Sequence, residues 1–227
     1  VYKRQPLLTL SVEENLAPTL DWLQTRLDLD AAQLRQIVVR YPYLLLKSVE
    51  KMESRLDWLQ RRLGLDEARL RKMVLRLPPL LYLSVEENLA PTLEWLQRRL
   101  DLDDAGLRKV VLQLPPVLGY SVEANIAPTL DWLQSRLDLD AAQIKRVVLG
   151  RPALLGYSVE NNMAPSLDWL QRRLDLDDAQ LKKMVVTLPP LLGYSVKDNM
   201  APKFDWLQTR LDLDDAQLKK MVLKLPR

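Results

Sequence analysis

The chain has 227 residues, of which 48% are hydrophobic and 28% are charged, and its formal net charge is +3. It contains neither cysteine nor histidine, which excludes disulfides and zinc–thiolate sites and removes the commonest acid–base and metal-ligating side chain. No apolar run approaches the ~18 residues that a membrane-spanning helix requires. We therefore expect a helical protein that is not an enzyme, lies outside membranes, and needs no cofactor, metal or small-molecule substrate.

Six tryptophans mark a repeated unit. They stand at Trp22, Trp58, Trp95, Trp132, Trp169 and Trp206. The intervals between them are 36, 37, 37, 37 and 37 residues, and a period of this length is typical of helical solenoids. We predict one array over residues 6–225, divided into units 6–41, 42–77, 78–114, 115–151, 152–188 and 189–225. Residues 1–5 form an out-of-register remnant before it and Pro226 opens a further copy, so the chain is expected to be a fragment.

Each unit is predicted to begin with a helix that a serine caps. In the first unit Ser11 is a good N-cap and Glu14 stands where a capping-box partner would, a pair that the third unit repeats. Apolar residues then recur every three or four positions, the pattern of an amphipathic helix. Pro18 interrupts the helix, as a proline does in four other units, and predicts a kink or turn from which the helix restarts. The second unit has Arg55 instead, and its helix is expected to be straighter.

The second helix of each unit is predicted to begin at an aspartate. Asp30 is the N-cap and Gln33 its capping-box partner, an arrangement that recurs in three later units. The helix ends at a proline-rich apolar link such as LPPLLGYS, because proline cannot continue a helix and restricts the residue before it. The link is short, which favours a 3₁₀ turn over a strand. The predicted fold is all-α, a right- or left-handed α-solenoid with two α-helices and one 3₁₀ turn per repeat.

Basic residues fall at two adjacent positions of the second helix. The first is basic in every unit: Arg35, Arg71, Arg108, Lys145, Lys182 and Lys219. The next is basic in all but the first unit, which has Gln36: Lys72, Lys109, Arg146, Lys183 and Lys220. At about 100° per residue, this second position lies opposite the main apolar face and is expected to be the most exposed. Helices stacked roughly 8–10 Å apart would carry such residues along about 50 Å, or about 15 base pairs. Acidic residues lie in separate rows, so both basic sets are candidates for binding a polyanion.

A combined motif runs through all six units. It reads Pro-x-Leu-Leu-Gly-Tyr-Ser-Val-Glu, then a leucine-rich helix through Pro to Trp-Leu, then a capped Leu-x-x-x-Val helix that ends in Leu-Pro. This pattern resembles the mitochondrial transcription termination factor (mTERF) repeat family. That family usually has Gly-Leu between the two helices, which only Gly64-Leu65 keeps here, because the other five units have aspartate in place of the glycine.

The resemblance implies a left-handed superhelix in a protein of the mitochondrion or chloroplast. It also implies that a basic concave face binds double-stranded DNA, or structured RNA, to regulate transcription, including its termination. We expect the protein to be a monomer.

The same residues allow other interpretations. A helical array also suits a protein-binding scaffold, or an RNA-binding factor in organellar RNA processing. The tryptophans are expected to pack in the core, with stacking on bases as the alternative. The repeated Leu-Asp-Leu-Asp is interpreted as helix capping rather than a cation site. The residue four positions beyond the exposed basic site varies among units, and is either a tolerant surface position or a place where bases are read: Arg40, Arg76, Gln113, Gly150, Thr187 and Lys224.

Overall fold

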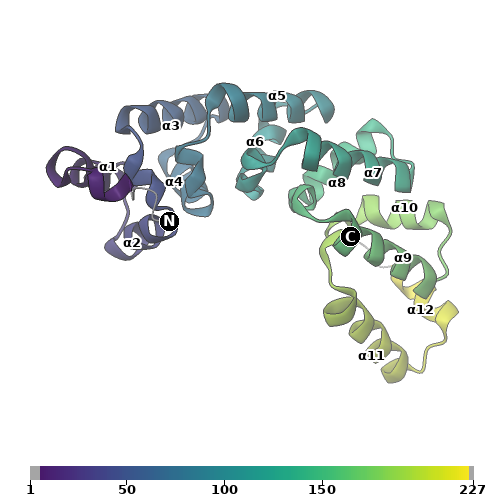
Figure 1. Cartoon of the computed structure of the whole chain (residues 1–227). Helices are drawn as coiled ribbons and strands as arrows, with labels where there is room; N and C mark the ends of the chain where they lie inside the picture. The colour runs from purple at the N-terminus through teal and green to yellow at the C-terminus, as the bar shows by residue number, and fades with distance from the viewer. Residues whose placement is uncertain (1–5, 225–227) are drawn as a thin grey trace, which may run out of the picture. The chain divides into compact units, whose positions relative to one another are not determined.

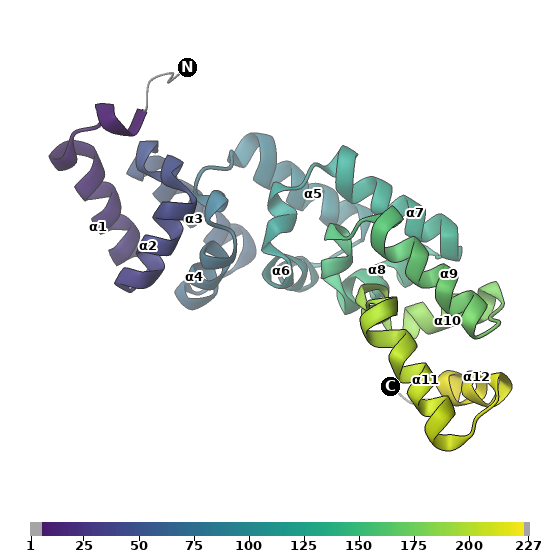
Figure 2. The same cartoon turned by 60° about the horizontal axis from the view of Figure 1, so that its bottom comes forward.

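The computed structural model describes residues 6–224, and every regular element in that range is helical. The chain divides into two compact units, Val1–Trp95 and Leu96–Arg227, with the boundary inside the first helix of the third repeat. Figures 1 and 2 show the helices of both units in chain order. The predicted N-terminal remnant, residues 1–5, and the residues from 225 onward lie outside the described residues.

Two α-helices and a 3₁₀ helix make up each repeat, as predicted. The first helices are α1 (Ala17–Arg26), α3 (Val49–Leu63), α5 (Ala90–Arg99), α7 (Ala127–Leu137), α9 (Ala164–Arg173) and α11 (Ala201–Leu211). The second helices are α2 (Ala31–Arg40), α4 (Glu67–Arg76), α6 (Asp104–Gln113), α8 (Ala141–Gly150), α10 (Asp178–Thr187) and α12 (Asp215–Lys224). The 3₁₀ helices are η1 (Pro6–Thr9), η3 (Pro42–Leu46), η4 (Pro78–Leu81), η6 (Pro115–Gly119), η8 (Pro152–Gly156) and η10 (Pro189–Gly193).

Proline changes the hydrogen-bond register at the start of the first helix. Five repeats begin with a π-helical turn: η2 (Val12–Leu16), η5 (Val85–Leu89), η7 (Val122–Ile126), η9 (Val159–Met163) and η11 (Val196–Met200). In the first repeat the amide of Leu16 donates to the carbonyl of Ser11, five residues back, at 3.1 Å. Pro18 lacks an amide proton and would crowd the carbonyl four residues before it, and the wider turn relieves that clash. With Arg55 in place of proline, α3 runs unbroken for 15 residues, which confirms the prediction of a straighter helix.

The serine caps are confirmed, but the predicted capping-box partner in the first helix is wrong. Ser11 Oγ accepts a hydrogen bond from the amide of Glu14 at 3.2 Å, as a cap should. Its own amide donates to Asn15 Oδ1 at 3.1 Å rather than to the side chain of Glu14. The same exchange occurs in the third repeat, where Asn88 replaces Glu87 as the acceptor. The π turn has more residues per turn than an α-helix, so the fourth residue rather than the third lies beside the cap.

Aspartate takes the left-handed conformation between the two helices. In all but the second repeat the residue at this place is an aspartate with φ between 45° and 49°: Asp28, Asp101, Asp138, Asp175 and Asp212. Gly64 has the same conformation, with φ of 58°. A left-handed residue other than glycine costs on the order of 1 kcal/mol. The turn therefore keeps its geometry at an energetic cost that other contacts must offset.

The six tryptophans lie beside the helical core, and two of them contact the following repeat. All but the last are half-buried. The ring of Trp169 lies 5.4 Å from that of Phe204 on the next first helix, and Trp22 Nε1 donates to Glu53 Oε2 at 2.7 Å. Trp206, in the last described repeat, is 62% exposed. In the first five repeats the leucine after the tryptophan is buried but the tryptophan is not, so the tryptophans border the core rather than lie within it as predicted.

Candidate nucleic-acid interface

The two adjacent basic positions of the second helices differ in their surroundings. The side chains at the second position are all exposed, which confirms the prediction from helix geometry, and we call them the exposed set: Lys72, Lys109, Arg146, Lys183 and Lys220. The side chains at the first position are half-buried, except that Arg35 in the first repeat is exposed. One residue along a helix therefore separates two different environments.

Four residues of the first position bind the inter-helix turn of the preceding repeat, and we call them the tied set: Arg71, Lys145, Lys182 and Lys219. Lys145 Nζ donates to the backbone carbonyl of Asp101 and lies 3.4 Å from its carboxylate. Lys182 makes the same two contacts with Asp138. Arg108, the residue of the third repeat at this position, is also half-buried.

The first repeat-to-repeat contact in this series uses arginine. Arg71 Nη1 donates to Asp28 Oδ2 at 2.7 Å, and Nη2 donates to Gln33 Oε1 at 3.1 Å. The aspartate carboxylates of all these pairs are 90% or more exposed, so each pair contributes at most about 1 kcal/mol. That is comparable to the cost of the left-handed aspartate, and the cation also satisfies a carbonyl in three of the pairs.

A second row of arginines is also engaged between repeats. Near the end of the first helix, Arg136 Nη2 donates to Asp168 Oδ1 at 3.0 Å and to Gln171 Oε1 at 2.6 Å in the next repeat. Arg99 makes the matching bonds one repeat earlier. The aspartates that precede Trp132 and Trp169 in the sequence are therefore partners of these arginines. This row stabilises the stack and offers little free charge to a ligand.

In the first repeat the equivalent arginine is Arg26, which has three acidic partners: Glu53, Asp57 and Glu67. Arg26 Nε lies 2.8 Å from Glu53 Oε1, and Nη1 lies 2.5 Å from Glu67 Oε2. The hydrogen bond from Arg26, together with one from Gln60, lowers the pKa of Glu67 from its ordinary value. The exposed set differs from both rows, because within residues 6–224 its five side chains form no ion pair with another residue.

Neighbouring second helices bring exposed-set residues together in the second unit. Helices α6 and α8 are in contact, and so are α8 and α10. A groove of about 320 Å³ between α8 and α10 is lined by Arg146, Lys182, Lys183 and Thr187, with aliphatic atoms of Val186 between them. Thr187 is one of the variable positions, all of which are exposed. The groove thus joins cations from two repeats to a position whose identity changes from repeat to repeat.

Other kinds of site are not evident in the described part of the chain. Residues 6–224 contain no cluster of three or more acidic side chains arranged to hold a metal ion. None of the helices in the same range is both long enough and apolar enough to cross a membrane.

The tied set shows what the sequence pattern did not reveal. Both basic positions repeat with the same period, and both were predicted to face a polyanion. A signal was present, because each tied lysine follows a turn aspartate by 44 residues, one repeat plus the step from the turn into the helix. The pairing depends on how repeats stack, which periodicity alone does not give.

A repeated helix–helix–3₁₀ unit with a column of exposed cations defines a helical-repeat protein suited to a polyanionic partner. The chain belongs to the mTERF family, whose sequence profile matches residues 1–102 and 97–226. Membership implies an organellar protein with a nucleic-acid-binding regulatory role, in a family whose members are generally not enzymes. A search of curated protein sequences gave no match.

Proposed function

We propose that the protein binds double-stranded DNA in a mitochondrion or chloroplast, and that it regulates transcription, including termination, without chemistry. The observation that carries this proposal is the exposed set, five cations at one helical position that have no acidic partner within residues 6–224. Cations without an internal partner are the groups that can neutralise phosphates and release counterions. The tied set, by contrast, holds neighbouring repeats together.

Phosphate contacts by the exposed set would give affinity and register but little sequence preference. Lysine and arginine bind the backbone in the same way at every site, so recognition of a particular sequence needs residues that differ among repeats. Thr187 lines the groove between α8 and α10 together with Lys183, and we propose it as one of these residues. A rigid stack of repeats along a duplex would act by blocking or positioning a polymerase. We propose that the six repeats of residues 6–225 serve as one binding array.

Salt dependence tests this proposal directly. With five phosphates neutralised, the logarithm of the association constant for duplex DNA should fall against the logarithm of salt concentration with a slope of about −4.5, or about 0.9 per contact. Duplex RNA and single-stranded DNA of matched sequence form the other arms. Binding that does not depend on salt would overturn the proposal, and tighter binding to duplex RNA would move the function to organellar RNA.

A further inference from the structure

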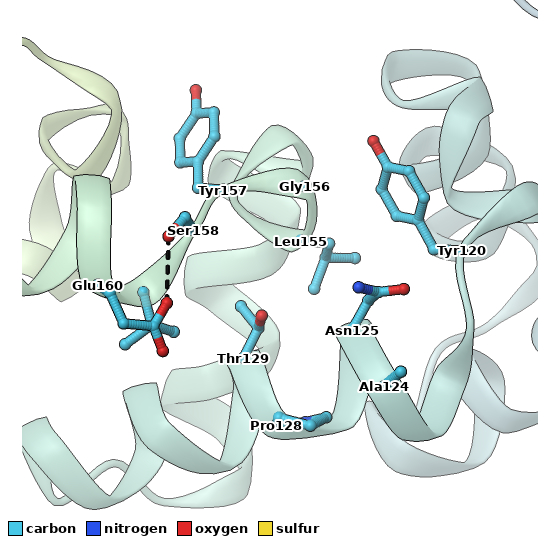
Figure 3. Close-up of a pocket in the computed structure, with 11 residues that line it drawn as sticks. Tyr120, Ala124, Asn125, Pro128, Thr129, Leu155, Gly156, Tyr157, Ser158 and Glu160 are labelled. Atoms are coloured by element: carbon cyan, nitrogen blue, oxygen red, sulfur yellow. Dashed lines mark hydrogen bonds between the residues drawn. The ribbon is translucent and has the colours of Figure 1, made fainter.

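Two equivalent cavities open between consecutive repeats of the second unit, at the start of the first helices. The larger, about 420 Å³, lies between Tyr120 and Tyr157, with Asn125, Pro128 and Thr129 between them. Figure 3 shows the two tyrosine rings on either side of the opening. The next cavity, about 280 Å³, lies one repeat further along and repeats this lining: Tyr157, Asn162, Pro165, Ser166 and Tyr194. Tyr157 is a wall of both, and we call the two adjacent cavities together the groove.

Glycines of the 3₁₀ helices make room for the tyrosines. A Cβ atom on Gly156 would lie 2.8 Å from Tyr120 Oη, and one on Gly193 would lie 2.6 Å from Tyr157 Oη. Any other residue at either place would push the ring aside. Tyr157 is held further by Arg151, whose Nη2 donates to the tyrosine hydroxyl at 2.7 Å. The groove therefore has fixed aromatic walls.

The first unit lacks this arrangement. Leu83 stands before the serine cap where the second unit has tyrosine, and Tyr82 stands where the second unit has glycine. The tyrosine walls are thus not a by-product of the repeat itself, because the same backbone forms with leucine at this place.

The lining of the groove contains asparagine, tyrosine and hydroxyl donors and one carboxylate, Glu160, which accepts from Ser158 Oγ, and it contains no lysine or arginine. Asn125 Oδ1 accepts a hydrogen bond from the Ser121 amide at 3.2 Å, which leaves the side-chain amide protons to face the cavity. Asn162 is held in the same way by Ser158. Arg151 beside the groove is already engaged by Tyr157, and the lining itself offers phosphates a carboxylate and no cation, whereas a neutral chain with free carbonyls can accept from the amide donors.

The separation of adjacent repeats can be compared with the repeat length of a neutral peptide chain. Adjacent helices pack roughly 8–10 Å apart, and among the 3₁₀ helices that border the groove η6 contacts η8 and η8 contacts η10. A polyproline II helix rises about 3.1 Å per residue with three residues per turn, so every third residue recurs at about 9.3 Å. Its carbonyls have no internal partners, and proline has no amide proton to leave unsatisfied.

We propose that this groove binds a proline-rich segment of a partner protein in the polyproline II conformation, with one proline of a Pro-x-x-Pro sequence in each cavity. Aromatic walls and amide donors are the features by which grooves of this kind hold such segments. The proposal does not rest on nucleic-acid binding, because the groove and the exposed set are formed by different elements of each repeat.

Binding of labelled decaproline to the whole chain, measured by fluorescence anisotropy, tests the proposal against a labelled Gly-Ser decamer and labelled oligo-dT. Decaproline should bind and the Gly-Ser decamer should not. Tyr157→Leu should weaken binding by about tenfold because it removes a wall of both cavities, and Tyr120→Leu should have a smaller effect. The matched control is Tyr43→Leu, since Tyr43 is 67% exposed and lies outside the groove.

Leucine occurs naturally at this place in the first unit, so the variants are expected to fold, and unchanged helical circular dichroism will verify it. Tyr157→Phe, which keeps the ring, should retain most of the affinity. Equal binding of the two decamers, tighter binding of oligo-dT, or an unchanged affinity in Tyr157→Leu would overturn the proposal. Affinity for duplex DNA should be the same in Tyr157→Leu and the unmodified protein, so either proposal can fail without the other.

Discussion

Lys145 and Arg146 are neighbours on α8 and carry the same charge, yet their side chains lie in different surroundings. Lys145 is half-buried and donates to the carbonyl of Asp101 in the preceding repeat, whereas Arg146 is exposed and lines the groove between α8 and α10. The same contrast recurs along the array. A turn of about 100° around the helix decides whether a cation serves cohesion between repeats or is available to a ligand.

Removing charge from one set at a time should give the largest effect. Glutamine at all five exposed-set positions, the residue that Gln36 supplies in the first repeat, should weaken duplex DNA binding at low salt by at least about hundredfold and flatten its salt dependence. Glutamine at the tied set is the matched control and should retain most of the affinity. Equal losses of affinity for duplex DNA in the two variants, measured by fluorescence anisotropy, would contradict the different roles of the exposed set and the tied set.

The turn aspartate offers a test of the cohesive role. Asp138→Ala should destabilise the protein by about 1 kcal/mol, because alanine takes the left-handed conformation poorly and the partner of Lys182 is lost. Asp138→Gly should fall within about 0.5 kcal/mol of the unmodified protein, since relief of the left-handed conformation offsets the lost pair. Urea unfolding distinguishes them, and the two substitutions should differ in stability if the turn conformation matters.

A smaller effect is expected from the cation itself. Lys182→Met keeps the aliphatic stem and removes the bonds to Asp138, and it should cost about 0.5–1 kcal/mol in the free energy of unfolding. Lys183→Met, one residue along, should change stability by less than about 0.5 kcal/mol. A larger loss at Lys183 than at Lys182 would contradict the assignment of the two sets.

The smallest effect concerns pH. Hydrogen bonds from Arg26 and Gln60 lower the pKa of Glu67 in the folded protein. Its contribution is therefore complete above the ordinary carboxyl pKa and is lost as pH falls through the lowered value. Because Glu67 is largely exposed, the contribution is less than about 0.5 kcal/mol. Glu67→Gln should reduce the fall in stability between neutral and acid pH, as followed by thermal unfolding.

Much of the fold is readable from the sequence because it depends on neighbours in the chain. Pro18 predicts an interrupted first helix, and Arg55 predicts an unbroken one. Ser11 predicts the cap of the first helix. The π turn and the role of Asn15 were not foreseen, because the same proline is compatible with several ways of relieving one clash.

In the candidate site, too, features that depend on residues close in the sequence were predicted, and features that join different repeats were not. Exposure of Lys183 follows from helix geometry alone, and the structure confirms it. The bond from Lys182 to Asp138 was not predicted, since it joins residues of different repeats and depends on the offset between stacked helices. The groove beside Tyr157 was likewise hidden, because the sequence presents the tyrosine only as part of a link.

Each tie between a second helix and the turn before it closes a loop of 43 or 44 residues. The entropy lost on closing a loop depends on its length, so successive ties carry nearly the same cost. Within either compact unit, each tie should therefore add a nearly equal increment to the free energy of folding. Loss of one tie should destabilise the two repeats that it joins and have little effect on the stability of the others.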